Sequence, residues 1–208
     1  SFKIPAGQKV ALVGKMGSGK STLSKLIAGM IEPTSGAILV DGIDVRQIDP
    51  ADVRKNIGVM LQDSWLFSGT IRENIQMGFN EYDDEHVLEI CKVAGVDDFV
   101  GSHPKGYDLE VKERGIGLSG GQKQAINLAR SLIHKPDILL LDEPTSSMDQ
   151  GTEQKVVGSL NEFCKDKTML IVTHRNPILA MVDRVFVMEG GKIIADQTPE
   201  QLGIKKVA

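Results

Sequence analysis

The residues with the clearest chemical capacity form a short glycine-rich run near the start of the chain. Residues 14–21 read G-K-M-G-S-G-K-S and fit the pattern G-x-x-x-x-G-K-[ST] without a mismatch. The glycines let the backbone curl so that successive N–H groups surround phosphate oxygens, and the following helix adds its positive end. The alternative, a glycine-rich turn without a ligand, is disfavoured by the position of the run between a predicted strand and a predicted helix. We therefore predict that a nucleoside triphosphate is bound by Gly14, Lys15, Met16, Gly17, Ser18, Gly19, Lys20, Ser21 and Thr22.

Three residues of this run have individual predicted roles. Lys20 is expected to reach the β- and γ-phosphates as a point charge, and the Ser21 hydroxyl is expected to ligate Mg²⁺. Thr22 is placed for a further contact with the α-phosphate.

Two carboxylates follow an apolar run later in the chain. Residues 138–141 read I-L-L-L and are followed by Asp142 and Glu143. A carboxylate at a strand tip suits a direct or indirect contact with Mg²⁺, and the next carboxylate is placed to polarise an attacking water. Alone, such a pair is usually a solvated loop. Together with the glycine-rich run it predicts Asp142 as a metal ligand and Glu143 as the general base.

The elements that must position these residues follow an α/β pattern with a mainly parallel sheet. Apolar runs predict strands at residues 9–13, 57–61, 138–141 and 168–172. Helical spacing predicts helices at residues 21–31, 120–134 and 152–164, followed by a short helix led by Pro177 and a hairpin over 184–195. An extended stretch at 37–40 before the turn Asp41-Gly42 predicts a small antiparallel β part on the N-terminal side.

A change of character divides the chain. From about residue 63 to 117, amphipathic patches at 82–94 and 96–100 dominate and strand signals are few. We therefore predict a P-loop NTPase core formed by residues 1–62 and 118–208, with an inserted α-helical subdomain at 63–117.

Composition narrows the class of protein. The chain has 208 residues, 25% of them charged, and a net charge of −4, which argues against nucleic-acid binding by phosphate neutralisation. Cys91 and Cys164 are the only cysteines and lack metal-ligand spacing, so a reducing compartment is expected. Apolar runs fall short of the ~20 residues of a membrane helix, and the chain begins abruptly at Ser1 without a signal peptide. We expect a soluble piece, excised from a longer protein, that sits beside a membrane.

Residues 118–122 are the segment that indicates a protein family. Residues 118–122 read L-S-G-G-Q and precede a predicted helix, where small residues present N–H groups and a hydroxyl to an anion; a plain helix cap is the alternative. The segment resembles, residue for residue, the signature motif of the ATP-binding domains of ABC transporters. The resemblance implies a head-to-tail homodimer that sandwiches ATP and Mg²⁺, each ATP contacting the other copy's Ser119, Gly120, Gly121 and Gln122.

Further segments match the same family in the expected order. Gln62, at the end of strand 57–61, resembles the glutamine that senses Mg²⁺ and the attacking water. Asp149 resembles a loop aspartate that usually crosses the dimer interface, and His174 resembles the histidine that contacts the γ-phosphate. Residues 112–115 (K-E-R-G) resemble a segment that touches the membrane domain, but Lys112 stands where the family usually has glycine.

The branch of the family is suggested by local sequence. Residues 68–75 resemble exporters whose ATPase is fused behind six membrane helices. Residues 144–149, 172–175 and 182–185 are more similar to bacterial type I secretion ATPases, with a lipid, drug or peptide exporter as the alternative. The resemblance implies a place at the cytoplasmic face of the inner membrane. Through the six-helix domain, a secretion ATPase would also meet a periplasmic adaptor and an outer-membrane channel.

One feature of the family, the aromatic residue that stacks on adenine, is not found in this sequence. The aromatic residue that stacks on adenine comes from an upstream strand, whereas Phe2 is too close to the glycine-rich run to be that residue. We expect this strand to be absent and adenine affinity to be weakened.

Two other classes of protein are alternatives. A relative acting on DNA or ribosomes would carry a coiled-coil insertion or a second cassette. A catalytically inactive cassette would be expected to lack Glu143, His174 or the signature.

Overall fold

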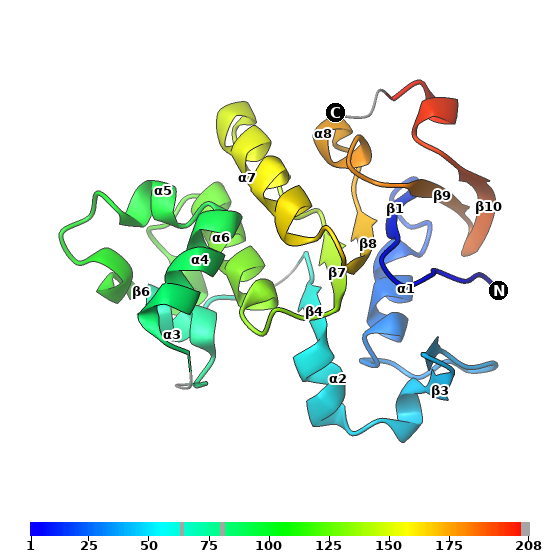
Figure 1. Ribbon diagram of the computed structural model, residues 1–208, viewed down its shortest axis with the longest axis horizontal. Helices are drawn as coiled ribbons and strands as arrows, with labels where there is room; N and C mark the ends of the chain where they lie inside the picture. Colours follow the sequence, from blue (N-terminus) through cyan, green and yellow to red (C-terminus); the bar gives the residue numbers. More distant parts are fainter. Residues whose placement is uncertain (63–64, 80–81, 205–208) are drawn as a thin grey trace. The chain divides into compact units, whose positions relative to one another are not determined.

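The computed structural model describes residues 1–62, 65–79 and 82–204. The chain divides into two compact units (Figure 1), which we call the sheet unit and the helical unit. The sheet unit contains residues 1–61, 134–143 and the chain from 166 onward, and the helical unit contains 62–133 and 144–165. The helical unit therefore includes the predicted insertion at 63–117 together with two further helices that the sequence grouped with the core. None of the helices among the described residues is long and apolar enough to cross a membrane.

A six-stranded sheet forms the centre of the sheet unit, and five of its strands are parallel. Its order is β10-β9-β1-β8-β7-β4 (Figure 1), with β10 running antiparallel to β9. The strands are β1 (Lys9–Val13), β4 (Ile57–Met60), β7 (Ile138–Asp142), β8 (Thr168–Val172), β9 (Arg184–Glu189) and β10 (Lys192–Gln197). The middle strands read as apolar runs because both faces of a parallel sheet are covered. Side chains such as Leu12, Leu140, Val172 and Phe186 form its core.

The helices of the sheet unit are short: α1 (Lys20–Ile27), α2 (Pro50–Asn56), α8 (Asn176–Leu179) and the 3₁₀ turns η1 (Val45–Gln47) and η4 (Glu200–Leu202). The predicted helix over 21–31 is wrong at its end, since α1 stops at Ile27. The N–H of Gly29 (φ 67°) donates to Leu26 O, and the N–H of Met30 donates to Lys25 O. This pair of bonds closes the last turn and is the usual glycine-containing helix end.

The small antiparallel part is confirmed as a hairpin of β2 (Leu39–Val40) and β3 (Ile43–Asp44). Asp41 and Gly42 both have positive φ, the conformation that a two-residue hairpin turn requires. The sequence reading missed α2, although Asp49 caps it and Pro50 occupies its first turn, both of which are helix-start signals.

The helical unit is built on α3 (Ile71–Gln76), α4 (Asp84–Ala94), α5 (Asp97–Val100), α6 (Gly120–Leu132) and α7 (Gln150–Phe163). Helix α6 packs on α3 and α4, and α4 also packs on α7. Their facing side chains are fully buried, including Ile75, Ile90, Ile126 and Leu160. The unit also holds the two-residue strands β5 (Gly69–Thr70) and β6 (Glu110–Val111) and the turns η2 (Gly106–Asp108) and η3 (Glu113–Gly115).

Arg130 on α6 fixes the chain that leads into α3. Its guanidinium donates to Asn74 O (2.8 Å), to Asn74 Oδ1 (3.0 Å) and to Trp65 O (2.8 Å). Asn74 in turn pairs with both backbone polar groups of Phe67. Burial lowers the pKa of Arg130 to about 10, so it remains charged at neutral pH. The charged Arg130 guanidinium, through hydrogen bonds to several acceptors, therefore holds this segment in place.

Candidate nucleotide site

The glycine-rich run forms the connection from β1 to α1, at the carboxyl end of β1, where ligands of open α/β sheets bind. Lys20, the first residue of α1, folds back over this connection. Its Nζ donates to Gly14 O (2.7 Å) and to Lys15 O (3.0 Å). The ammonium thus lies within the loop that it would share with a phosphate, where the two loop carbonyls hold it.

The β9–β10 turn supports the same loop. The N–H of Gly191 donates to Ser18 O (3.0 Å). A Cβ added to Gly14 would lie 2.2 Å from Met188 O and 2.8 Å from Ser18 Oγ, so a larger residue does not fit there. The contacts of Met188 and Gly191 with this loop were not predicted from the sequence, because both residues lie far along the chain from residue 18 and only the strand order brings them together.

Ser21 and Asp142 form a pair suited to Mg²⁺. Ser21 Oγ donates to Asp142 Oδ2 at 2.9 Å, which joins the start of α1 to the end of β7. Hydroxyl and carboxylate oxygens are ligands that Mg²⁺ accepts, and this ion commonly uses only one or two protein ligands and completes its shell with phosphate and water. No cluster of three or more acidic, histidine or cysteine side chains suited to a metal occurs among the described residues. The residues present therefore fit a nucleotide-bound Mg²⁺ rather than an all-protein metal cage.

Glu143 and His174 are in contact just beyond the carboxyl ends of β7 and β8. His174 Nδ1 lies 2.7 Å from Glu143 Oε1. Glu143 follows β7 directly, and its N–H donates to Val172 O, the last residue of β8. Its φ of 51° is unusual for a residue with a side chain, and such conformations are often found at functional sites. The glutamate side chain is mostly buried, with 16% exposed, whereas 76% of the histidine side chain is accessible to a ligand.

The remaining predicted phosphate contacts lie on the same connection. Met16, Gly17 and Lys15 are exposed at the tip of the loop, and Ser18 is buried beneath it. Thr22 is exposed on the first turn of α1. The sheet unit therefore brings together the loop, Lys20, Ser21, Asp142, Glu143 and His174 at the carboxyl ends of β1, β7 and β8.

The signature residues lie in the helical unit, at the N-terminus of α6. Ser119 Oγ accepts the N–H of Gln122 (3.2 Å), and Gln122 Oε1 accepts the N–H of Ser119 (2.9 Å). This reciprocal capping box uses two donors of the first turn. The N–H groups of Gly120 and Gly121 and the Ser119 hydroxyl proton remain as the donors that the signature can offer an anion. The plain helix cap considered from the sequence is thus present, and it leaves these donors for the anion that the sequence predicts.

Gln62 and Asp149 also belong to the helical unit. Gln62 is exposed and lies two residues beyond β4. Asp149 is the N-cap of α7: its carboxylate accepts from the N–H groups of Gly151 and Thr152 and from the Thr152 hydroxyl. The Thr152 hydrogen bonds, chiefly that of its hydroxyl, hold the pKa of Asp149 below its usual range. This cap also explains why α7 begins at Gln150, earlier than predicted.

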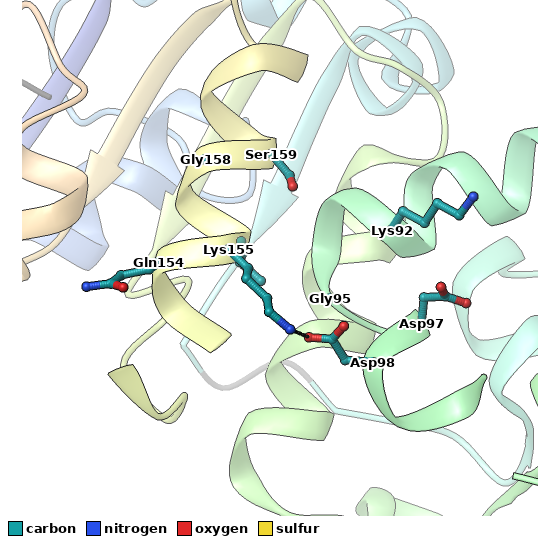
Figure 2. A pocket seen from close by; sticks show the side chains of 9 residues that line it. Lys92, Gly95, Asp97, Asp98, Gln154, Lys155, Gly158 and Ser159 are labelled. Atoms are coloured by element: carbon teal, nitrogen blue, oxygen red, sulfur yellow. Dashed lines mark hydrogen bonds and ion pairs between the residues drawn. The ribbon is translucent and has the colours of Figure 1, made fainter. Parts of the chain in front are cut away.

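A separate hollow of about 520 Å³ lies in the helical unit between α4, α5 and α7 (Figure 2). Lys155 on α7 bridges to Asp98 on α5 across it, with 3.3 Å between Nζ and Oδ2. Lys92, Asp97 and Ser159 also line it. None of its lining residues belongs to a nucleotide motif, so it is not part of the predicted site.

Comparisons with known proteins identify the family of the chain. A family model described as "ABC transporter" matches residues 1–146. The chain is similar to the putative multidrug export ATP-binding/permease proteins YgaD of Bacillus subtilis (43% identity, 97% of this chain and 35% of the relative) and SAB1799c of Staphylococcus aureus (43%, 100% and 36%). It therefore spans about a third of the length of these curated relatives.

A solved structure of a bacterial Atm1-family ABC exporter with ATP bound is also similar. It shares 37% identity and a TM-score of 0.90 over 97% of this chain and 35% of that one. The match extends over both units, and the family model covers the glycine-rich loop, the signature residues and the two carboxylates. The chain therefore belongs to the ABC transporter family, as an exporter-type ATP-binding domain of the kind that hydrolyses ATP.

Proposed function

We propose that this chain hydrolyses ATP at a site centred on Glu143 and that two copies of it act as the motor of a membrane exporter. The observation that carries the proposal is the 2.7 Å contact between Glu143 and His174 at the strand ends next to the Ser21–Asp142 pair. A carboxylate held by a histidine beside a phosphate-binding loop is an arrangement suited to activating water.

In the proposed reaction, the phosphates of ATP take the place of the Gly14 and Lys15 carbonyls as partners of Lys20. The N–H groups of the loop surround the β-phosphate, and the positive end of α1 favours the added negative charge. Ser21 and Asp142 would hold Mg²⁺, which supplies charge neutralisation at the phosphates when it is bound. Glu143 then orients a water for in-line attack on the γ-phosphorus and accepts its proton, while the bond from the γ-phosphorus to the β–γ bridging oxygen breaks and ADP leaves.

The contact with Glu143 constrains the role of His174. An ionised carboxylate only accepts hydrogen bonds, so Nδ1 must carry the proton in this contact. In a neutral ring the other nitrogen, Nε2, is then an acceptor and cannot donate to a phosphate. His174 can therefore stabilise the γ-phosphate while holding Glu143 only as an imidazolium. In that form it would place a positive charge beside the group that gains negative charge in the transition state.

A second copy of the chain completes each site in this proposal. Its Ser119 hydroxyl and the Gly120 and Gly121 N–H groups would face the γ-phosphate bound by the first copy's Lys20, and Gln62 would respond to the metal and the water. The capping box supports this role because it fixes the Ser119 oxygen and leaves its proton available.

A single substitution tests the assignment of the base. Glu143→Gln keeps the shape of the side chain but cannot accept the proton from water, so turnover should fall by about a hundredfold or more. ATP binding should persist, and an ATP-dependent dimer should accumulate on a sizing column. Glu162→Gln, on the exposed face of α7, is the matched control and should behave as wild type. Unchanged turnover in Glu143→Gln would refute Glu143 as the base.

The transported class follows from the relatives rather than from the site. The names of the curated relatives describe putative multidrug export and the solved structure describes an Atm1-family exporter. They favour the drug, lipid or peptide exporter and lend no support to type I secretion, with its adaptor and outer-membrane channel. We propose that the parent protein joins this domain to a six-helix membrane domain, exports small apolar molecules, and keeps the domain at the cytoplasmic membrane face.

Vesicles can separate these two classes. The full-length parent protein, reconstituted in liposomes, should show ATPase stimulation by apolar cationic drugs and ATP-dependent drug uptake. Stimulation by a large polypeptide instead, with no response to drugs, would favour the secretion class.

We also propose that an upstream strand supplies the adenine contact. Within the described residues β2 and β3 form a sheet of two strands, with Leu39 and Ile43 exposed. Such a hairpin is marginally stable alone and gains from a third strand. A chain extended upstream to include an aromatic residue should bind ATP more tightly than residues 1–208, whereas its affinity for inorganic triphosphate should stay the same.

A further inference from the structure

Gln124 joins the signature helix to the loop that precedes α7. Its Oε1 accepts the N–H of Ser147 at 2.8 Å, and its Nε2 donates to Ser146 Oγ at 3.0 Å. One amide thus bonds two consecutive residues that are more than twenty positions away in the chain. The backbone N–H of Ser147 can only donate, so the orientation of the Gln124 amide is defined by this pairing.

The same loop lies against the first residues of α6 without space between them. A Cβ added to Gly121 would lie 3.1 Å from Ser147 O, and one added to Gly120 would lie 3.2 Å from Ser147 Cβ. Close approach of two backbones is a place where glycine is needed. The signature glycines therefore serve a contact inside the chain, in addition to the contact with an anion proposed above.

The two ends of the loop are anchored independently. Thr145 Oγ1 donates to Glu153 Oε1 at 2.6 Å, with both residues buried. Asp149 caps α7, and Met148 N–H donates to Thr145 O. Gln124 thus provides a polar link between the middle of a well-held loop and the signature helix.

We infer that Gln124 is a positioning residue that holds the 144–149 loop and the Ser119–Gly121 turn as one surface. This inference rests on the proposed function, in which both segments meet a second copy of the chain around ATP. If the link is lost, each segment can still form, but only the packing of Gly120 and Gly121 against Ser147 then holds the two together. Formation of the ATP-bound dimer should then become less favourable, whereas ATP binding to a single copy through Lys20 should not change.

The test compares Gln124→Met, which keeps length and removes both hydrogen bonds, with Gln124→Glu, which can still accept from Ser147 N–H. Gln154→Met, at an exposed position of α7, is the control. Hydrogen exchange of the Ser147 amide should be about tenfold faster in Gln124→Met, the factor expected for loss of ordinary hydrogen bonds. It should be near wild type in Gln124→Glu and Gln154→Met.

The functional readouts are turnover and dimer formation. In Gln124→Met, kcat and the ATP-driven dimer measured in a Glu143→Gln background should fall about tenfold. Binding of a fluorescent ATP analogue to monomer should stay unchanged, a split that a merely destabilised fold would not produce. Wild-type exchange and turnover in Gln124→Met would overturn the inference, as would equal losses in Gln124→Glu and Gln124→Met. If Glu143→Gln itself never dimerises, the proposed function fails, while amide exchange still decides whether Gln124 holds the loop.

Discussion

Replacing Gly14 by alanine places one methyl group where the glycine-rich loop passes β9. The added Cβ would lie 2.2 Å from Met188 O and 2.8 Å from Ser18 Oγ. An ordinary contact between carbon and oxygen is about 3.3–3.6 Å, so the carbonyl and the loop must separate by about 1 Å. The Ser18 hydroxyl can turn away. The Met188 carbonyl belongs to the backbone of β9, which pairs with β1 in the register Val13↔Val187 just before the clash.

The expected loss of stability depends on how easily the Met188 carbonyl can move. Overpacking at a well-packed position costs typically 1–3 kcal/mol. Because a strand carbonyl cannot move without disturbing its pairing with β1, we expect the upper end, about 3 kcal/mol. For a chain of this size each kcal/mol corresponds to about 2–4 °C, so the melting temperature should fall by roughly 6–12 °C. Nucleotide affinity should fall as well, since the carbonyl of residue 14 helps to hold Lys20.

Thermal melts followed by circular dichroism would measure the change, with Gly158→Ala as the matched substitution. Gly158 lies within α7 and an added Cβ would meet nothing within 4 Å. Alanine there should stabilise the helix by up to about 1 kcal/mol. The reasoning is refuted if Gly14→Ala has the melting temperature of the wild type, or if the melting temperature of Gly158→Ala falls as far as that of Gly14→Ala.

Four further outcomes are expected. Thr70→Ala removes the capping box of α3 and should lower the free energy of unfolding by about 1 kcal/mol in urea titrations. Arg130→Met leaves the carbonyl of buried Asn74 and the exposed carbonyl of Trp65 without their donor, and should cost about 2 kcal/mol in the same assay. The hydrogen bond from Arg46 lowers the pKa of Asp44 from 3.8 to about 2, so its stabilisation is complete above pH 3.8 and is lost as the pH falls towards 2; the stability difference between wild type and Asp44→Asn should disappear over that interval. His174→Ala should retain ATP binding and lose turnover by about a hundredfold, and a variant with full activity would contradict the pairing with the base.

The strands were predictable because central parallel strands are buried on both faces and read as apolar runs. Residues 9–13 and 168–172 were predicted with the bounds that the structure shows. Short elements were missed even though their start signals are present, namely Asp49-Pro50 before α2 and the Thr70–Glu73 capping box at α3. Each spans only two turns or fewer, too short for a helical period to stand out.

The site shows the same division between local and long-range information. Lys20, Ser21 and Asp142 follow from motif and strand order, because the carboxyl ends of parallel strands meet at one edge. The support of the loop by Met188 and the link from Gln124 to Ser147 depend on register and on packing between distant segments. No local pattern encodes those contacts.

The capping box at Ser119 has a consequence for how activity varies with acidity. The donors that it leaves for an anion are backbone N–H groups and a hydroxyl, and none of them gains or loses a proton between pH 5 and 9. In a site shared by two copies, the donors at Ser119, Gly120 and Gly121 would thus keep the same protonation state over this pH range. Any dependence of the rate on pH would then arise outside the signature residues, and a substitution at Ser119 should lower the whole pH–rate profile without changing its shape.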